Sequence, residues 1–176
     1  VAGGRPYAET AFSQAMRLVA QLIKAQVGVE VACIDVDGWD THVAQGGAVG
    51  SLASNLTELA DGLAAFYEDL QAQMGKVTVV VMSEFGRRAQ ENGGLGTDHG
   101  HGSMMMTLGG GINGGRVYVR WPGLHDEQLV GPGDLAVTTD YRDVLGEIIQ
   151  KRLNNPLLPA IFPGYTVTPL GLAVPR

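Results

Sequence analysis

The sequence has 176 residues, of which 45% are hydrophobic, and a net charge of −6, so it is long and apolar enough for one globular domain with a core. The negative charge and the lack of a Lys/Arg-rich run exclude the basic surface that nucleic-acid binding requires. The single cysteine excludes an intramolecular disulfide, and no stretch approaches the roughly 18 apolar residues of a membrane span.

Two elements are predicted at the start of the chain. Residues 9–27 carry apolar side chains at helical spacing and stop at Gly28, which predicts an amphipathic helix. Residues 29–36 (VEVACIDV) are short, mostly apolar and rich in β-branched side chains, which predicts a strand buried on both faces, as in a parallel sheet. Cys33 lies within this run, so we expect a buried, unreactive thiol.

A βαβ unit is predicted next. Residues 48–74 place apolar side chains three or four positions apart, which predicts one helix about 40 Å long. Residues 77–82 (VTVVVM) predict a second buried strand. Two strands joined by a helix run parallel, with a right-handed crossover. The loops that follow these strands, 37–42 and 83–88, are therefore expected at one edge of the sheet.

The second half of the chain is predicted to be less regular. Its expected elements are a glycine-rich loop over 89–102, a short third strand over 103–108, an edge strand over 116–120, a loop over 124–137 that contains His125, and a helix over about 141–153 capped by Asp140. The tail from residue 154 is expected to lack regular structure. No internal repeat or linker marks a second domain, so one α/β domain is predicted over residues 1–176. The opening of the chain is typical of the middle of a longer protein.

Histidines and carboxylates gather in the two polar loops. Asp40 and His42 are two positions apart, as are His99 and His101, and residues at this spacing share a face of an extended segment. Imidazoles and carboxylates are the ligands of Zn²⁺, Mn²⁺ and related ions. We therefore predict one or two divalent metal ions, bound by Asp40, His42, Asp98, His99 and His101. The alternative is a hydrogen-bonded polar cluster that fixes two glycine-rich loops.

Other polar side chains near this edge have candidate roles. Glu84 is predicted to be a further metal ligand or an acid beside the metal. Arg87 is a candidate catalytic clamp for a phosphate, sulfate or carboxylate group, and its alternative is an ion pair with a neighbouring carboxylate. Ser83 and Thr41 lie outside any nucleophile-elbow pattern, so their hydroxyls are expected to bond to loop backbone. Gln45 either binds a ligand or caps the long helix.

Three motifs follow one another in the chain. They are Gly38-Trp39-Asp40-Thr41-His42 with Gln45, then Ser83-Glu84-Phe85-Gly86-Arg87, then Gly96-Thr97-Asp98-His99-Gly100-His101. Together with Thr139-Asp140-Tyr141-Arg142 and Phe162-Pro163-Gly164-Tyr165, they resemble the DUF1501 family of bacterial proteins over nearly the whole chain. That family is itself similar to the alkaline phosphatase and sulfatase superfamily.

The resemblance implies a fold, a cofactor and a reaction. The implied fold is an α/β fold like that of alkaline phosphatase, a three-layer α/β/α sandwich with a mainly parallel sheet, of which this chain is similar to the C-terminal part. The implied cofactor is a pair of metal ions, zinc or manganese. The implied reaction is hydrolysis or transfer at phosphate or sulfate esters. Asp40 and His42 match the Asp and His that follow one core strand in the superfamily, and His99 or His101 matches a later His.

The sequence departs from the superfamily pattern at one position. Glu84-Phe85 stands where the superfamily has an Asp-His pair, so only the carboxylate matches, although in a second alignment Asp98-His99 is that pair. The superfamily nucleophile lies in the N-terminal half of the longer family chains, outside the part that this sequence resembles. The resemblance also implies a twin-arginine export signal and hence an exported or periplasmic location in bacteria.

The predicted function is that of a metal-dependent hydrolase acting on a small anionic ester, a phosphate or a sulfate. The alternative is a non-catalytic binding or scaffold protein that keeps the fold and holds a partner protein or a glycan. Either protein would act without nucleic acid. A missing N-terminal half or a second copy of the chain is expected to cover the sheet edge that this part would otherwise expose.

Overall fold

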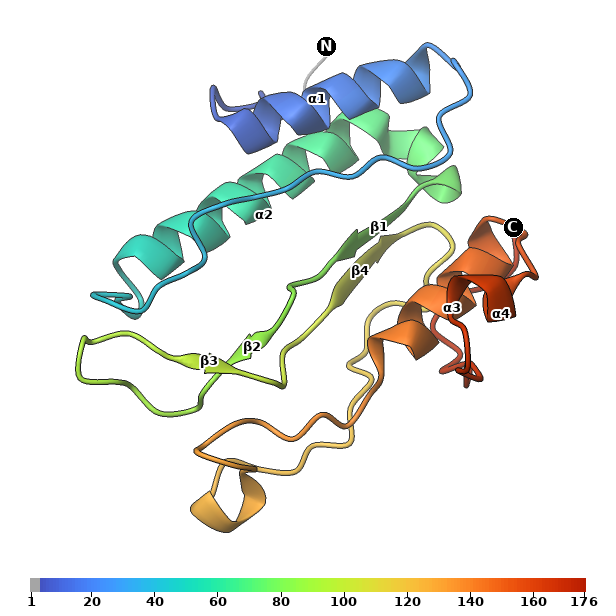
Figure 1. Cartoon of the computed structure of the whole chain (residues 1–176). Helices are drawn as coiled ribbons and strands as arrows, with labels where there is room; N and C mark the ends of the chain where they lie inside the picture. Colours follow the sequence, from blue (N-terminus) through green and yellow to red (C-terminus); the bar gives the residue numbers. More distant parts are fainter. Residues whose placement is uncertain (1–3) are drawn as a thin grey trace. The chain divides into compact units, whose positions relative to one another are not determined.

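The computed structural model describes residues 4–176, and the chain divides into two compact units (Figure 1). The first unit contains the residues up to Gln73 together with Glu91–Thr97, and the second contains Met74–Gln90 and Asp98–Arg176. The prediction that residues 1–176 form one domain stays a prediction.

The first unit is built on two helices that pack against each other, α1 (Ala11–Lys24) and α2 (Ser51–Leu70). Both were predicted from their apolar stripes, and both are confirmed. Thr10 caps α1, because its side chain accepts a hydrogen bond from the backbone N–H of Ser13. A Cβ on Gly62 of α2 would lie 2.5 Å from Cε1 of the buried Phe12, so this glycine lets the two helices approach closely.

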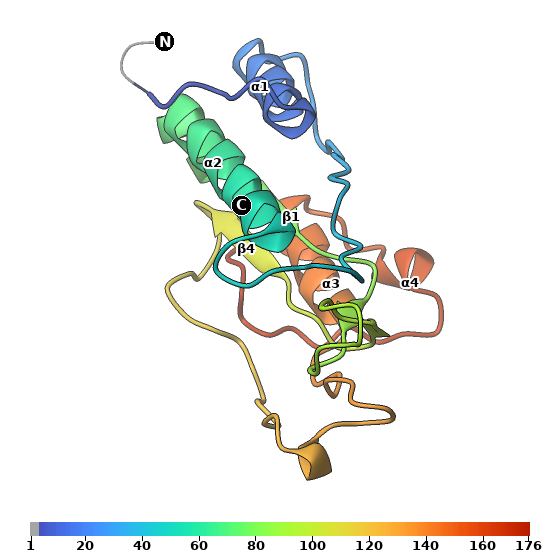
Figure 2. The same cartoon turned by 90° about the vertical axis from the view of Figure 1, so that its left-hand side faces the viewer.

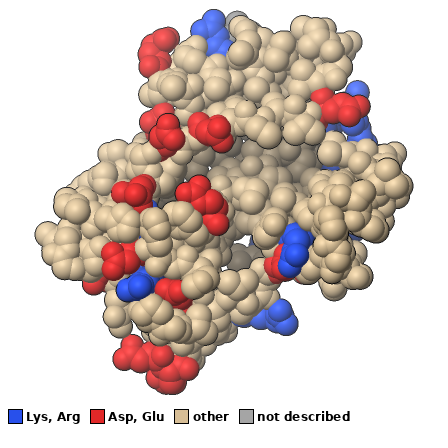
Figure 3. Space-filling view, in the orientation of Figure 1, with Lys and Arg blue, Asp and Glu red and all other residues tan. Residues whose placement is uncertain are grey.

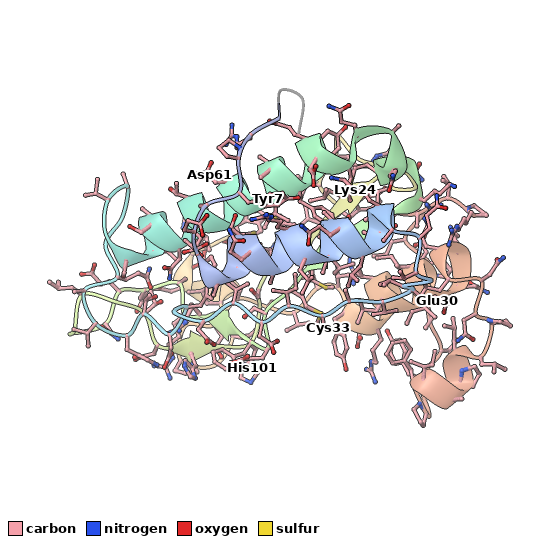
Figure 4. All side chains as sticks on the ribbon, turned by 90° about the horizontal axis from the view of Figure 1, so that it is seen from above. Tyr7, Lys24, Glu30, Cys33, Asp61 and His101 are labelled. Carbon is pink, nitrogen blue, oxygen red and sulfur yellow. The ribbon has the colours of Figure 1, made fainter. Side chains whose placement is uncertain are left out.

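Polar contacts tie the start of the chain and the end of α1 to α2. The hydroxyl of Tyr7 donates a hydrogen bond to Asp69 at 3.1 Å, and the Lys24 ammonium donates to the same carboxylate (Figure 4). Burial, and after it the charge of Asp69, raise the pKa of the Tyr7 phenol above its ordinary value. Arg5 donates to Asp61 at 2.6 Å. Asp69 is thus the acceptor that both Tyr7 and Lys24 share.

The segment between the two helices differs from the prediction. Residues 29–36, which include the labelled Glu30 and Cys33 of Figure 4, form neither helix nor strand, and Val29 and Val31 are 39% and 65% exposed while Ile34 and Val36 are half-buried. The expected burial of Cys33 is also wrong, because this residue is exposed. Glu30 and Asp35 fall on opposite sides of an extended segment, so a strand buried on both faces would remove a carboxylate from water on each face.

The strands of the second unit form two small antiparallel sheets (Figure 2). In one sheet β1 (Thr78–Val81) pairs with β4 (Met106–Gly109), with Val79 opposite Leu108. In the other, β2 (Gly86–Arg87) pairs with β3 (His99–Gly100). The strands expected over 77–82 and 103–108 therefore exist, with β4 shifted towards the C-terminus, but they pair with each other.

The predicted fold class is wrong. The described residues contain four helices and two antiparallel two-stranded sheets, and neither a parallel sheet nor a three-layer α/β/α sandwich is present among them. The βαβ prediction fails because residues 29–36 do not form its first strand. The edge strand expected over 116–120 is also not found in the described chain. Tyr118, at its centre, packs against the core of the second unit, whereas Val117 and Val119 on either side are 85% and 52% exposed.

The core of the second unit lies under helix α3 (Tyr141–Arg152), whose bounds and Asp140 cap confirm the prediction. Its buried members are Val144, Ile148, Leu172 and Ala173. The carboxylate of Glu147, which is fully buried, accepts backbone hydrogen bonds from Leu170, Gly171 and Ala173 and so fastens the tail to the helix. The tail also contains a short helix, α4 (Leu158–Ile161), where no regular structure was expected.

The remaining helical segments are two short 3-10 helices. One is η1 (Gln71–Lys76), directly after α2, and the other is η2 (Asp126–Gln128), in the loop before α3. His125 precedes η2 and is exposed, as predicted for a surface loop residue. Within residues 4–176, no helix has the length and apolar character needed to cross a membrane. Figure 3 shows acidic and basic side chains scattered among uncharged residues on one face.

Candidate metal centre

In the first unit, the structure brings Asp40 and His42 together. His42 Nε2 lies 3.1 Å from Asp40 Oδ1. Thr41 between them is buried, with 8% exposure, while the side chain of Asp40 is 69% exposed and that of His42 is 38% exposed. The i, i+2 spacing therefore places both groups on the outer side of this loop, as the sequence predicted.

A network of amides and hydroxyls holds this loop in place. Gln45 Oε1 accepts hydrogen bonds from the hydroxyls of Thr41 at 2.7 Å and Thr97 at 2.8 Å. Gln45 therefore joins two motifs of the same unit. Its backbone, rather than its side-chain amide, serves the start of α2, because its carbonyl accepts from Leu52 N and from Ser51 Oγ.

The short loop at Glu91–Thr97 packs against the backbone of His42. Asn92 Nδ2 donates to the His42 carbonyl at 3.1 Å, and Asn92 Oδ1 accepts from the backbone N–H groups of Gly94 and Gly96. A Cβ on Gly96 would lie 2.3 Å from the carbonyl oxygen of His42, so only glycine permits this approach. The glycines of this motif are thus required by close backbone packing.

The second unit holds the remaining predicted residues around the β2–β3 pair. His99 stacks on Phe85, with ring centroids 4.0 Å apart. Phe85, which stands where the resemblance leads one to expect a histidine, therefore packs against one. Arg87 lies opposite His99 in the antiparallel register. Glu84 is exposed, and its predicted catalytic role with Arg87 stays a prediction.

His101 has a different partner from His99. Its Nδ1 lies 2.5 Å from Oδ2 of Asp134, a carboxylate that is only 4% exposed. Arg88 stands on the other side of that carboxylate, with its Nε 3.8 Å from Asp134 Oδ1, and its Nη1 lies 3.7 Å from Asp98 Oδ2. The two histidines, predicted to share one face, are thus held by unlike groups.

Asp134 is a residue that the sequence reasoning missed. It follows the tight Gly131-Pro132-Gly133 turn, in which both glycines have positive φ. Val130 and Asp134 exchange two backbone hydrogen bonds across this turn, each 2.9 Å long. A Gly-Pro-Gly turn that ends in an acid was the available signal, but its histidine partner lies 33 positions away in sequence.

The two nucleophile candidates both donate hydrogen bonds, but only Ser83 donates to loop backbone as predicted, whereas Thr41 donates to a side chain. Ser83 Oγ donates to the carbonyl of Phe85 at 2.8 Å, and the Thr41 hydroxyl donates to Gln45. Asp40, His42 and His99 are candidate metal ligands by their donor atoms, one carboxylate and two imidazoles. Whether a metal binds, and which one, stays a prediction.

Comparison with known proteins gives one result. No curated protein matches the chain, and no solved structure matches it. A match is found to the family described as "Protein of unknown function (DUF1501)", and it covers residues 3–150. Since this match spans most of the chain, the protein belongs to the DUF1501 family.

Proposed function

We propose that the protein binds a divalent metal ion, zinc or manganese, and acts as a metal-dependent hydrolase on phosphate or sulfate esters. The observation that carries the proposal is the pairing of exposed imidazoles with carboxylates, at Asp40–His42 and at Asp134–His101. Imidazole nitrogens and carboxylate oxygens form the donor set that these ions take in proteins.

The donor groups fit a metal in a further respect. A metal-ligating histidine usually donates its other ring N–H to a carboxylate or a carbonyl, which fixes the ring. His101 has such a carboxylate partner in Asp134. His42 faces a carboxylate as well, with its Nε2 3.1 Å from Asp40 Oδ1.

The chain's own residues have distinct parts in this proposal. Asp40 and His42 in the first unit, and Asp98, His99 and His101 in the second, are the candidate ligands, and a bound divalent ion would supply polarisation of the ester oxygens. Arg87 would orient the anionic group of the substrate, because a guanidinium matches phosphate and sulfate oxygens. Glu84, exposed beside it in sequence, would hold a proton for the leaving group.

The proposal extends to the substrate and the place of action. The ligand would be a small anionic ester or a glycan that carries one. An exported, periplasmic location and a relation to the alkaline phosphatase and sulfatase superfamily belong to the same proposal. It rests on the donor residues and not on the fold, since the fold expected from that superfamily is absent from the described residues.

The first experiment is elemental analysis of protein purified without chelators or a histidine tag. We expect one to two equivalents of zinc or manganese, and a loss of metal in Asp40→Asn and in His99→Gln. His125→Gln is the matched control, because it removes an exposed imidazole from a loop outside the candidate ligands. Metal content that is absent even after soaking with zinc or manganese, or that is the same in all variants, would overturn the metal site.

A second function is favoured by one observation. The hydroxyls of Ser83 and Thr41 donate to neighbouring acceptors, and neither is paired with a base. This favours a non-catalytic protein that binds a glycan or a partner protein through the same loops. Assays of the metal-loaded protein with 4-nitrophenyl phosphate and 4-nitrophenyl sulfate separate the two functions. Turnover that is lost in Arg87→Lys supports the hydrolase. Metal binding without any turnover supports the binding protein.

A further inference from the structure

One contact in the second unit pairs an exposed histidine with a buried acid. The side chain of His101, which is labelled in Figure 4, is 79% exposed, whereas that of Asp134 is 4% exposed. His101 Nδ1 and Asp134 Oδ2 are 2.5 Å apart. A carboxylate can only accept hydrogen bonds, so Nδ1 is the nitrogen that carries the proton. In the neutral ring, the lone pair is then on Nε2.

The acid is itself held from two directions. Its backbone is fixed by the paired hydrogen bonds with Val130, and its Oδ1 faces Arg88 Nε at 3.8 Å. These two atoms are buried and have no hydrogen-bond partner among the described residues. Moving this buried carboxylate away from the guanidinium would separate two opposite charges, which disfavours its displacement. The acceptor offered to His101 is therefore rigid.

The surroundings of the imidazole are open. His101 and Asp134 border a shallow hollow whose other walls are mostly apolar, namely Val130, Pro132, Ala136 and Val137. Since Nδ1 is directed to the buried acid, the accessible part of the ring is the part that bears Nε2. A ligand that approaches His101 from solvent meets a nitrogen lone pair and no N–H donor.

We propose that Asp134 is the positioning residue of His101, which it holds in the Nδ1–H tautomer so that Nε2 is presented as a ligand or acceptor atom. This inference deepens the proposed function, because it names the group that orients one of the candidate metal ligands. Arg88 acts through Asp134 by keeping the acid in place. The arrangement corresponds to the acid that supports a histidine ligand in many metal sites, for which removal of the acid lowers metal affinity about 10- to 100-fold.

The direct test is the tautomer of His101 in the metal-free protein. Long-range ¹H–¹⁵N correlation of protein labelled at histidine, at about pH 9 where imidazoles are neutral, distinguishes a protonated Nδ1 from a protonated Nε2. The His101→Gln variant assigns the signal among the four histidines. We expect protonated Nδ1 in the unmodified protein. A protonated Nε2 there would overturn the proposal.

Variants of the acid extend the test. In Asp134→Asn the amide oxygen is expected to face Arg88 and the amide nitrogen to face His101 Nδ1, which would shift the proton to Nε2. Asp134→Ala should give a mixture of tautomers, and Glu127→Gln, an exposed acid in the same loop region, should leave the signal unchanged. An Nδ1–H signal that persists in Asp134→Ala at the same strength would contradict the positioning role.

Titration of the same proteins with zinc alone separates this inference from the proposed function. If both hold, zinc affinity falls about 10- to 100-fold in Asp134→Ala. If the unmodified protein has the Nδ1–H tautomer but binds no zinc, the positioning role stands and the metal site fails. If zinc binds equally to the unmodified protein and to Asp134→Ala, the metal site stands and Asp134 has no part in it.

Discussion

Replacing Glu147 by glutamine is expected to destabilise the second unit markedly, although the two side chains have nearly the same shape. Glu147 Oε2 accepts from the backbone N–H groups of Leu170 at 2.6 Å and Gly171 at 2.9 Å. Its Oε1 accepts from Ala173 N at 3.0 Å and from the Lys151 ammonium at 2.7 Å. Both oxygens therefore face donors only, and the NH₂ group of glutamine would face two donors in either orientation.

The magnitude follows from the number of bonds lost. At least two of the four hydrogen bonds disappear, and each hydrogen bond to a charged group contributes about 1.5–3 kcal/mol. A loss of about 3 kcal/mol in the free energy of unfolding is therefore expected. This value is the lower end of the range for two such bonds, because the variant no longer buries a charge. For a chain of this size, that loss corresponds to a fall in Tm of about 6–12 °C.

The same contacts predict a pH dependence. Burial alone would raise the pKa of the Glu147 carboxyl, but the hydrogen bonds from Lys151 and from the tail backbone outweigh it and hold the pKa below the ordinary value of 4.5. The stabilisation by Glu147 is thus fully present above pH 4.5 and is lost as the pH falls through the lower, folded-state pKa. The difference between the parent protein and Glu147→Gln should shrink over that range.

The assay is urea unfolding at pH 7 followed by circular dichroism, with Glu127→Gln as the exposed control. Hydrogen exchange locates the effect, since the amides of Leu170, Gly171 and Ala173 should exchange faster in Glu147→Gln. If this variant unfolds within about 0.5 kcal/mol of the parent, a difference typical of surface substitutions, the buried carboxylate does not fasten the tail.

Three further predictions concern the first unit. Gly62→Ala should lower the free energy of unfolding by about 1 kcal/mol, in spite of the better helix propensity of alanine, because its Cβ would meet the buried ring of Phe12 at 2.5 Å; thermal unfolding checks this, and an equal or higher Tm would disprove it. In an absorbance titration the pKa of the Tyr7 phenol should lie above its ordinary value of 10.0. The pKa should be somewhat lower in Asp69→Asn than in the parent but still raised, because burial is the larger cause and remains. The stability that Tyr7 provides is present below pH 10.0 and declines as the pH rises above it. Cys33 should react with a thiol reagent in the native protein, and reaction only after denaturation would show that the thiol is buried after all.

The helices were predictable because each carries its own signal. The apolar stripes of α1, α2 and α3 have a period that depends on the local chain alone, and the Asp140 cap lies next to the helix it starts. A strand, by contrast, requires a partner that the local sequence does not name. Residues 77–82 and 29–36 are both rich in valine, but the first pairs with β4, and the second, which has a carboxylate on each side, forms no strand.

The candidate site was predictable to the extent that its contacts are local. Asp40 and His42 meet because residues two apart in an extended loop share a side, and their separation of 3.1 Å agrees with that reasoning. For His99 and His101 the spacing did not name the partners, which are an aromatic ring directly before β2 for His99 and an acid 33 positions away for His101. Spacing within a motif predicts how neighbouring residues are placed along the backbone, but the contacts of their side chains also depend on partners that are distant in sequence.

The two imidazole–carboxylate pairs differ in what they require of the fold. Asp40 and His42 are both well exposed, so their contact needs little desolvation and contributes little to stability. Asp134 is almost fully buried, and its desolvation is a cost that Arg88 at 3.8 Å only partly offsets. An apolar residue at position 134 would avoid that cost, since the exposed imidazole of His101 needs no partner for solubility. A buried acid directed at an exposed histidine is therefore better explained by the orientation of the imidazole than by the stability of the second unit.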